Sequence, residues 1–279
     1  MSTPTQFAAA KRSARASSEY VNGPRRRGAR DRTWHFVTSG LHAAICRARW
    51  GIRASWRSTR VAERQRVPRR SHVLLRLERE TRPLHPEADF PWLALMAFDV
   101  TRTRYLDQLV ASYGFEAPIE AALALTPKLA EVIDVRPRAR SGFIVEDLLE
   151  LGLTPAKIAR LPQCRGIAPF RDPGEALGWL YVIERTTLLH DAIRTHIAAR
   201  VPMIAAWSYL SAYREVASLR WQDLGRTLDD YAITPAAAAH VIVAARGAFL
   251  ALREWNASEP AGLARAAWAR DPSQRIVRS

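Results

Sequence analysis

Apolar residues recur at helical spacing along most of the chain after residue 72. The clearest case runs from Asp172 to Val201, with Pro202 directly after it. Asp172, Pro173 and Glu175 form the N-cap and capping-box pattern that opens a helix, and Pro202 cannot continue one. The apolar side of this segment is broad, which is typical of a helix with neighbours on several sides. We therefore expect this helix to lie at the centre of the fold.

Three ionisable side chains, Glu184, His190 and Asp191, fall within or beside that apolar side. Charged residues are seldom buried without a partner, so one interpretation turns them outward at the edge of a buried stripe. The alternative is that the helix faces a ligand. The pattern alone leaves both interpretations open.

The rest of the chain predicts further helices. One is expected over residues 73–85, and another begins at Thr101 with a kink or break around Tyr113–Pro118. Further helices are expected to start at Ser, Thr-Pro or Asp-Pro punctuation, at Ser141, Thr154 and Thr234.

No alternating pattern typical of strands appears. The sequence therefore predicts one all-α domain of about eight helices over residues 73–257, followed by a loose tail over 258–279.

Charge separates the first part of the chain from the rest. Residues 1–72 contain 17 Lys and Arg against three acidic residues, a net charge of +14. The whole chain carries +15, which leaves 25 basic and 24 acidic residues, or +1, for residues 73–279. The basic character therefore belongs to the N-terminal segment and not to the helical domain.

Arg, Ser and Ala dominate residues 1–72, and such a composition buries too little apolar surface to offset chain entropy. We expect a disordered extension. Phosphate contacts with nucleic acid, an organelle transit peptide and a dispensable extension or upstream start codon are the three interpretations. The last is favoured, and nucleic-acid binding is expected only through this segment.

Several classes of chemistry lack their motifs. The chain has no phosphate-binding glycine loop, no nucleophile elbow and no paired Glu-x-x-His motif. Its two cysteines, Cys46 and Cys164, give neither a disulfide framework nor a Cys-x-x-Cys metal site. No apolar run approaches the roughly 18–20 residues of a membrane span. A cytoplasmic protein without membrane contact is expected.

A series of segments in this order resembles the bacterial biliverdin-producing heme oxygenases, including those paired with phytochromes. The resemblance covers nearly all of residues 73–257. It is carried by LRLERETRPLH (75–85), YGFEAPIEAAL (113–123), DLLELGL (147–153), LPQC (161–164), EALGWLYVIERTTLLHDAIRTHI (175–197), YLSAYREVASLRWQDLGRTL (209–228) and ARGAFLALREW (245–255).

The resemblance implies an all-α fold that sandwiches heme between a proximal and a distal helix. His85 matches the proximal ligand of the heme iron, and Arg82 is a candidate partner of a heme propionate. Residues 178–196 match the distal helix and include Tyr181, a candidate cofactor contact. In the family, O₂ and electrons from a reductase or ferredoxin convert heme to biliverdin, CO and ferrous iron, and a bilin-binding phytochrome is a partner of one type.

The distal helix departs from the family's pattern. Where the family typically reads LYVLEGSTLGG, this chain reads LYVIERTTLLH, so Arg185, Leu189 and His190 replace glycines. Glycines let a helix approach heme closely, and their loss also stiffens the helix.

Three hypotheses follow from this departure. Catalysis persists with Arg185 or Thr186 organising distal water, or His190 reaches the iron opposite His85, or the pocket is closed and heme is absent. Heme cleavage is the first expectation, and a non-catalytic heme-binding or signalling-partner protein is the alternative. A different small-molecule enzyme on this fold, of the thiaminase-like kind, is more distant.

Overall fold

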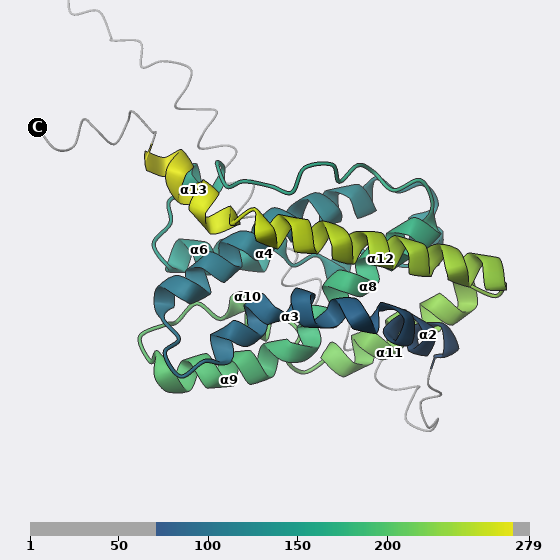
Figure 1. The fold of residues 1–279 in the computed structure, drawn as a ribbon, viewed down its shortest axis with the longest axis horizontal. Coiled ribbons are helices and arrows are strands. Elements are labelled where there is room, and N and C mark those ends of the chain that lie inside the picture. The colour runs from purple at the N-terminus through teal and green to yellow at the C-terminus, as the bar shows by residue number, and fades with distance from the viewer. Residues whose placement is uncertain (1–70, 270–279) are drawn as a thin grey trace, which may run out of the picture. The chain divides into compact units, whose positions relative to one another are not determined.

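The computed structural model describes residues 71–269, and all regular structure in this range is helical, as predicted (Figure 1). The segment 1–70 and the last ten residues lie outside the described range. The α-helices are α2 (His72–Thr81), α3 (His85–Leu93), α4 (Arg102–Ala124), α5 (Leu129–Val132), α6 (Ser141–Glu150), α7 (Pro155–Ile158), α8 (Pro173–Thr186), α9 (His190–Arg200), α10 (Ser208–Ser211), α11 (Ala217–Tyr231), α12 (Pro235–Ala257) and α13 (Pro260–Ala269). Short 3₁₀ helices are η2 (Arg82–Leu84), η3 (Ala94–Met96), η4 (Arg136–Arg138) and η5 (Thr187–Leu189).

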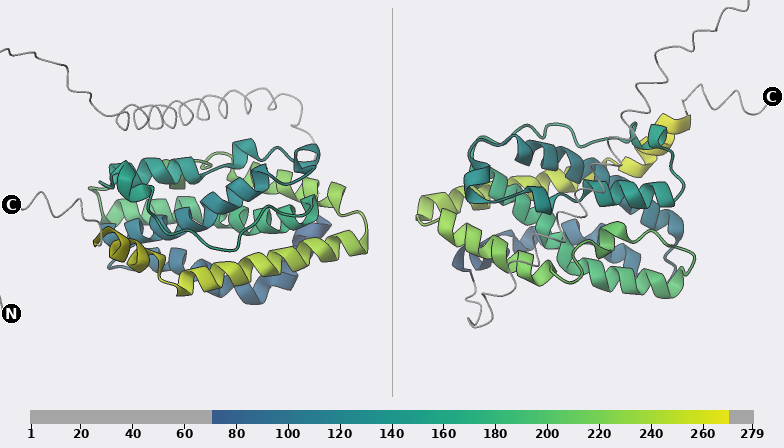
Figure 2. Two further views of the ribbon diagram at one scale, coloured as in Figure 1. Left: turned by 90° about the horizontal axis from the view of Figure 1, so that it is seen from above. Right: turned by 180° about the vertical axis from the view of Figure 1, so that it is seen from behind.

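Helix α8 is central, as its broad apolar side predicts. It packs along α12, and α4 lies against both helices, while α11 contacts α8 and α2 contacts α12 (Figures 1 and 2). Gly178 sets the distance between the two axes, since a Cβ there would lie 2.6 Å from both Ala244 Cβ and Val241 O. This close approach requires glycine on α8.

The predicted start of α8 is confirmed. The Asp172 side chain accepts a hydrogen bond from the backbone N–H of Glu175 at 3.0 Å, and Pro173 occupies the first turn. The Glu175 carboxylate accepts from the backbone N–H of Arg171, one residue earlier than a capping box requires.

The segment predicted as one helix over 172–201 contains a 3₁₀ turn. Helix α8 ends at Thr186, η5 follows, and α9 begins at His190. The hydroxyls of Thr186 and Thr187 donate to the carbonyls of Ile183 and Glu184, at 2.8 and 2.6 Å. Such bonds to carbonyls three residues back accompany the tightening of this turn.

Two other expectations concern helix boundaries. Helix α4 continues without a break through Gly114 and Pro118, and the Gly114 carbonyl, which Pro118 has no N–H to bond, accepts from the backbone N–H of Cys164 at 2.8 Å. The expectation that Ser141 caps α6 is wrong. The Glu120 carboxylate of α4 accepts from the backbone N–H groups of Arg140 and Ser141 and takes that role.

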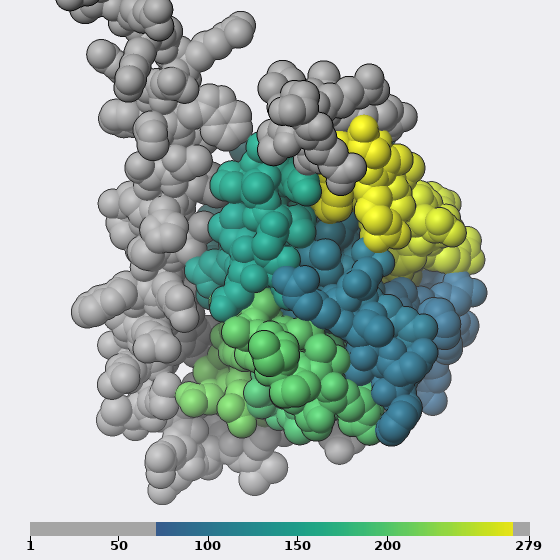
Figure 3. Space-filling view, turned by 90° about the vertical axis from the view of Figure 1, so that its left-hand side faces the viewer, coloured from purple at the N-terminus to yellow at the C-terminus, as the bar shows by residue number. Residues whose placement is uncertain are grey.

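The tail beyond residue 257 is not loose throughout, since residues 260–269 form α13. Ala264 is buried, Arg265 pairs with Asp107, and Trp268 Nε1 donates to the carbonyl of Lys157. These contacts bind α13 to the domain beside α4, where Figure 3 shows the yellow and blue segments meeting.

Helix α12 differs from the expectation that no segment is apolar enough to span a membrane. Its 23 residues include an 18-residue window of mean hydropathy 1.6, which by length and composition suffices to cross a membrane. Its buried residues include Val241, Ala245 and Phe249 and belong to the core that it shares with α8. The apolar character of α12 therefore also serves the interior of the domain.

Candidate functional site

His85 begins α3 and lies half-buried between three helices. Its Nε2 is 2.9 Å from Thr81 Oγ1, and its ring centroid is 5.3 Å from that of Phe249 on α12. The Thr81 hydroxyl donates to the carbonyl of Leu77 and lies 3.3 Å from the Tyr181 hydroxyl of α8. Because a hydroxyl has one proton, Thr81 accepts from His85 Nε2–H. The Nε2 lone pair is then unavailable to a metal.

The electrostatic surroundings keep His85 neutral. Burial, followed by the positive charge of Arg185, lowers the pKa of His85 to about 4, while Asp89 opposes the shift and Arg82 adds to it. Arg82 itself is exposed at the start of η2. The structure thus brings His85 and Tyr181 into one hydrogen-bonded group and leaves Arg82 at the surface.

An ion pair joins the helix of His85 to the central helix. The Arg185 guanidinium of α8 binds the Asp89 carboxylate of α3 through two contacts, at 2.5 and 2.7 Å. Both side chains are largely buried, with 18% and 13% exposed. Arg185, in the segment that matches the distal helix, is therefore joined to α3, the helix that begins at His85.

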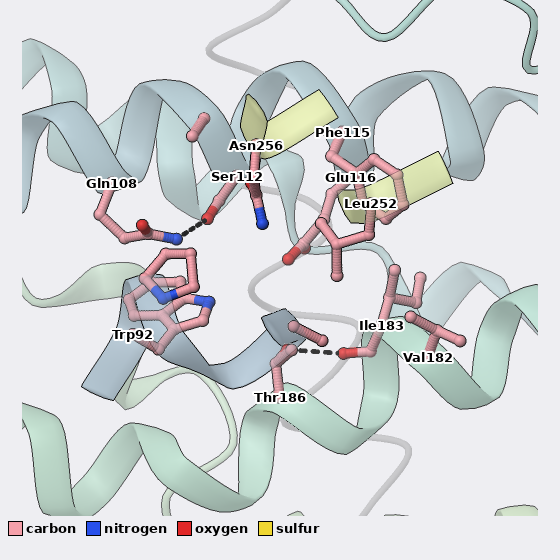
Figure 4. Close-up of a pocket in the computed structure, with 13 residues that line it drawn as sticks. Trp92, Gln108, Ser112, Phe115, Glu116, Val182, Ile183, Thr186, Leu252 and Asn256 are labelled. Atoms are coloured by element: carbon pink, nitrogen blue, oxygen red, sulfur yellow. Dashed lines mark hydrogen bonds between the residues drawn. The ribbon is translucent and has the colours of Figure 1, made fainter. Parts of the chain in front are cut away.

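A small cavity remains between α3, α4, α8 and α12. Its volume is about 30 Å³, which by the usual requirement per molecule is room for about two waters. Glu116 and Asn256 point toward its middle, opposite Trp92 and Thr186 (Figure 4). Thr186 therefore lines the space between the helices, but its hydroxyl is already bonded to the carbonyl of Ile183.

Glu184 lies on the other side of α8 from this cavity and does not turn outward. It is 2% exposed, and its carboxylate is 3.3 Å from both Arg138 and Arg220. Burial by itself raises the pKa of Glu184, but Arg220 and Arg138, with Arg140, hold it below its ordinary value. The outward interpretation is wrong for Glu184, because two buried guanidinium groups neutralise it.

A second buried group connects α4, α6 and α10. The Tyr209 hydroxyl donates to Glu116 at 2.5 Å, and Arg140 lies 3.1 Å from the other Glu116 oxygen. Arg140 also donates to the carbonyl of Ile183 on α8 at 2.7 Å. Burial raises the pKa of Glu116 to about 7, although Arg140 and Tyr209 both act to lower it.

His190 is buried, whereas Asp191 is exposed. The His190 ring packs against both Tyr209 and Trp92, with centroid distances of 4.7 and 5.5 Å. Its Nε2 has no hydrogen-bond partner among residues 71–269, and burial together with Arg140 holds its pKa well below the ordinary value. His190 therefore contacts Trp92 and Tyr209, whereas His85 contacts Phe249, so the two histidines share no ring partner.

Comparison with known proteins relates the chain to one solved structure. No model of a protein family and no curated protein matches the sequence. The structure is similar to that of the heme oxygenase from Neisseria meningitidis, solved with NO and CO bound, at a TM-score of 0.53 and 23% sequence identity. The match covers 66% of this chain and 91% of the other. The chain therefore has an all-α, heme-oxygenase-like fold.

The described side chains do not fit a bound heme. The cavity between the two helices is about 30 Å³, whereas pockets for drug-sized ligands measure about 300–1,000 Å³. The Arg185–Asp89 pair spans the same interval, and His85 Nε2 donates to Thr81. Heme would have to break both interactions before it could enter.

The sequence identified His85 and Arg185 as candidates, but it did not indicate their partners, Thr81 for His85 and Asp89 for Arg185. Asp89 follows His85 by four residues, so it shares the helix face, and this spacing was the available signal. Glu116 and Arg140 gave no such signal, because the groups that their side chains contact lie 24 or more residues away in the chain.

Proposed function

We propose that this chain is a non-catalytic protein on a heme-oxygenase-like scaffold, with the cleft between α3 and α8 closed to heme. The observation that carries the proposal is the Arg185–Asp89 ion pair, which lies where a cofactor would separate α3 from α8. Separating a largely buried ion pair leaves each charge buried without its partner, which costs free energy. An uncharged part of a ligand that entered between Arg185 and Asp89 would not recover this free energy. Arg185 on α8, Leu189 on η5 and His190 at the start of α9 stand where the family that the chain resembles has glycines, and these three side chains support the same proposal.

The proposal is tested by adding one equivalent of hemin to the purified chain and to an Arg185→Gly variant. We expect the unaltered chain to give the spectrum of free hemin. The variant removes the bridge and should acquire a sharpened Soret band. An Arg136→Gly variant, which removes an arginine from an exposed ion pair, serves as the matched control and should behave like the unaltered chain.

A second candidate is heme cleavage with His85 as the iron ligand. It is favoured by one observation, the neutral, half-buried imidazole at the start of the helix that faces α8. In this alternative Arg82 would pair with a propionate, and Thr186 and His190 would face the bound O₂. A reductase or ferredoxin would supply electrons, and biliverdin, CO and ferrous iron would leave, with a phytochrome as recipient of the bilin.

The same experiment separates the two candidates. A Soret band in the unaltered chain that disappears in His85→Ala, followed by red absorbance in air with ascorbate, would establish cleavage and refute the first proposal. A stable Soret band without turnover would show that the cleft admits heme, and it would identify the chain as a non-catalytic heme-binding protein.

A further inference from the structure

A cluster of exposed apolar side chains lies where η3 meets the end of α9. Phe98, two residues after η3, and Met203, three residues after α9, are each 89% exposed. Leu93, at the end of α3, and Met96, at the end of η3, are also exposed. Large apolar side chains gathered at the surface of a protein mark a place that binds another molecule. None of these four side chains lines the cavity between α3, α4, α8 and α12.

Contacts of α9 bring the two segments of this cluster together. The His196 Nε2 atom lies 3.1 Å from the carbonyl oxygen of Ala97, the residue before Phe98. The Arg200 guanidinium lies over the Phe98 ring, 5.8 Å from its centroid, and Met203 follows three residues later. Figure 3 faces this end of the domain, where the blue segment that joins α3 to α4 and the green segment after α9 lie side by side.

The exposure of the two most prominent side chains favours a fluid apolar environment. At 89% exposure, Phe98 and Met203 contact little of their own chain and extend from the surface on two separate segments. A protein partner would need a matched pocket for each of them. The boundary between lipid headgroups and acyl chains accepts apolar side chains without a matched shape. A membrane surface therefore suits this cluster.

The charge around the cluster is positive. Residues 90–104 and 198–207 contain Arg102, Arg104 and Arg200 against Asp99, which gives +2. Because residues 73–279 sum to +1, the rest of that range sums to −1. Asp99 pairs with Arg104 at 2.9 Å, whereas Arg200 is exposed and has no ion-pair partner among residues 71–269. An arginine beside an inserted aromatic ring can reach the phosphates of anionic lipids.

We propose that this end of the domain docks on an anionic membrane surface. Phe98 and Met203 would enter the boundary between headgroups and acyl chains, and Arg200 would lie at the level of the lipid phosphates. The net charge of +14 on residues 1–72 would add attraction to the same lipids. The proposal departs from the expectation of a protein without membrane contact, and it does not depend on whether the cleft between α3 and α8 admits heme.

The test measures how the full chain partitions onto lipid vesicles in a co-sedimentation experiment. One set of vesicles is phosphatidylcholine alone, and the other also contains phosphatidylserine. We expect stronger binding to the second set, and Phe98→Ser and Met203→Ser should each weaken it about tenfold by removing inserted apolar surface. The matched control is Ile233→Ser, which should leave binding unchanged. Ile233 is 84% exposed in the turn between α11 and α12, at the opposite end of the domain (Figure 1).

Ionic strength separates this cluster from the basic residues 1–72. Salt should weaken the binding of every variant, because it screens the attraction between the basic segment and the lipids. The tenfold ratio between the unaltered chain and Phe98→Ser should persist, since apolar insertion is not screened. Arg200→Gln should weaken binding about fivefold on the vesicles with phosphatidylserine and leave binding to phosphatidylcholine alone unchanged.

The proposal is overturned if the chain does not bind the vesicles. It is also overturned if Phe98→Ser, Met203→Ser and Ile233→Ser bind alike, which would assign all binding to the basic segment. A dimer in sedimentation equilibrium without lipid, dissociated by Phe98→Ser, would show instead that the cluster joins two copies of the chain. Urea unfolding verifies that each variant, at its exposed position, keeps the stability of the unaltered chain.

Discussion

At the scale of single residues, burial and the charge of Arg185 together keep His85 neutral. Burial is the larger cause and Arg185 the second of the lowering of the His85 pKa to about 4, and Asp89 opposes both. Arg185→Gln removes the unfavourable charge and leaves Asp89 unpaired beside the imidazole. We therefore expect the pKa of His85 to rise toward its ordinary value near 6.5.

The measurement is an NMR pH titration of the His85 ring in both proteins. Arg136→Gln is the control, since that arginine is exposed and pairs with Asp134. An unchanged or lower pKa in Arg185→Gln would show that the ion pair does not act on His85.

Glu116 should make stability depend on pH. Its pKa is raised to about 7 in the folded protein, against a reference value of 4.5. A raised pKa means that the folded state prefers the protonated form, so its stabilising effect is complete below pH 4.5 and is lost as the pH rises through 7. Glu116→Gln cannot ionise and lacks this dependence.

The prediction is tested with urea unfolding between pH 4 and pH 8.5. The free energy of unfolding of the unaltered chain, relative to Glu116→Gln, should fall by about 3 kcal/mol over this range. A difference that stays constant with pH would mean that Glu116 is ionised throughout. Tyr209 and Arg140 are present in both proteins and contribute equally to the background.

The residue types at the site were predictable only in part. His85 was identified from the resemblance, and it lies beside Thr81 of α2 and Phe249 of α12. Nothing in the local sequence indicates that the Thr81 hydroxyl binds the imidazole. The partner of a side chain depends on which groups lie on the neighbouring helix, and the spacing of residues within one helix does not indicate these groups.

At the scale of elements, the contact between α8 and α12 depends on Gly178. A Cβ there would lie 2.6–2.7 Å from Ala244 Cβ and from backbone atoms of Val241 and Ala245. Backbone atoms cannot move aside as a flexible side chain can. We expect Gly178→Ala to lower the free energy of unfolding by about 1–3 kcal/mol, as overpacking does.

Gly247 on α12 provides the matched control. It is exposed and helical, and a Cβ there meets no atom within 4 Å. Gly247→Ala should therefore stabilise the helix by up to about 1 kcal/mol. Both variants are measured by urea unfolding, and equal effects of the same sign would contradict the packing argument.

Helix starts were more predictable than helix interiors. Thr101, Thr154, Asp172 and Thr234 each accept the expected backbone hydrogen bond, because a cap is formed within four residues of sequence. The prediction that Ser141 caps α6 was wrong, because the Glu120 carboxylate of α4 accepts the hydrogen bonds from the backbone N–H groups at the start of α6. The end of α8 at Thr186 was not predictable either, because it coincides with hydrogen bonds from the Thr186 and Thr187 hydroxyls to the carbonyls of Ile183 and Glu184.

At the scale of the whole domain, buried charge joins helices that the hydrophobic pattern separates. The described core consists of two clusters, one around α2, α8, α11, α12 and the C-terminal half of α4, and one around the N-terminal half of α4, α6, α9 and α10. Glu116, on α4, bonds to Tyr209 of the second cluster, and Arg140 reaches the carbonyl of Ile183 in the first. The class of fold followed from periodicity, but this connection could not, since it joins segments far apart in sequence.

Glu184 has the largest expected effect on the whole domain. Its carboxylate neutralises Arg138 of η4 and Arg220 of α11, both at least 96% buried. Glu184→Gln removes the buried negative charge that both guanidinium groups share, while Arg138 keeps its contact with Asp223 and Arg220 keeps its hydrogen bond to the Pro137 carbonyl and its contact with the Tyr213 ring. We expect the free energy of unfolding to fall by about 3–5 kcal/mol.

Urea unfolding at pH 7 measures this loss, and Asp134→Asn is the control. Asp134 pairs with Arg136 in an exposed ion pair, so its removal should cost less than about 1 kcal/mol. Glu184 has a lowered pKa, so it stabilises the fold above its unfolded value near 4.5 and ceases to do so as the pH falls through its folded value. The difference between the unaltered chain and Glu184→Gln should therefore shrink in acid, whereas a difference that grows in acid would mean that the two arginines do not depend on this carboxylate.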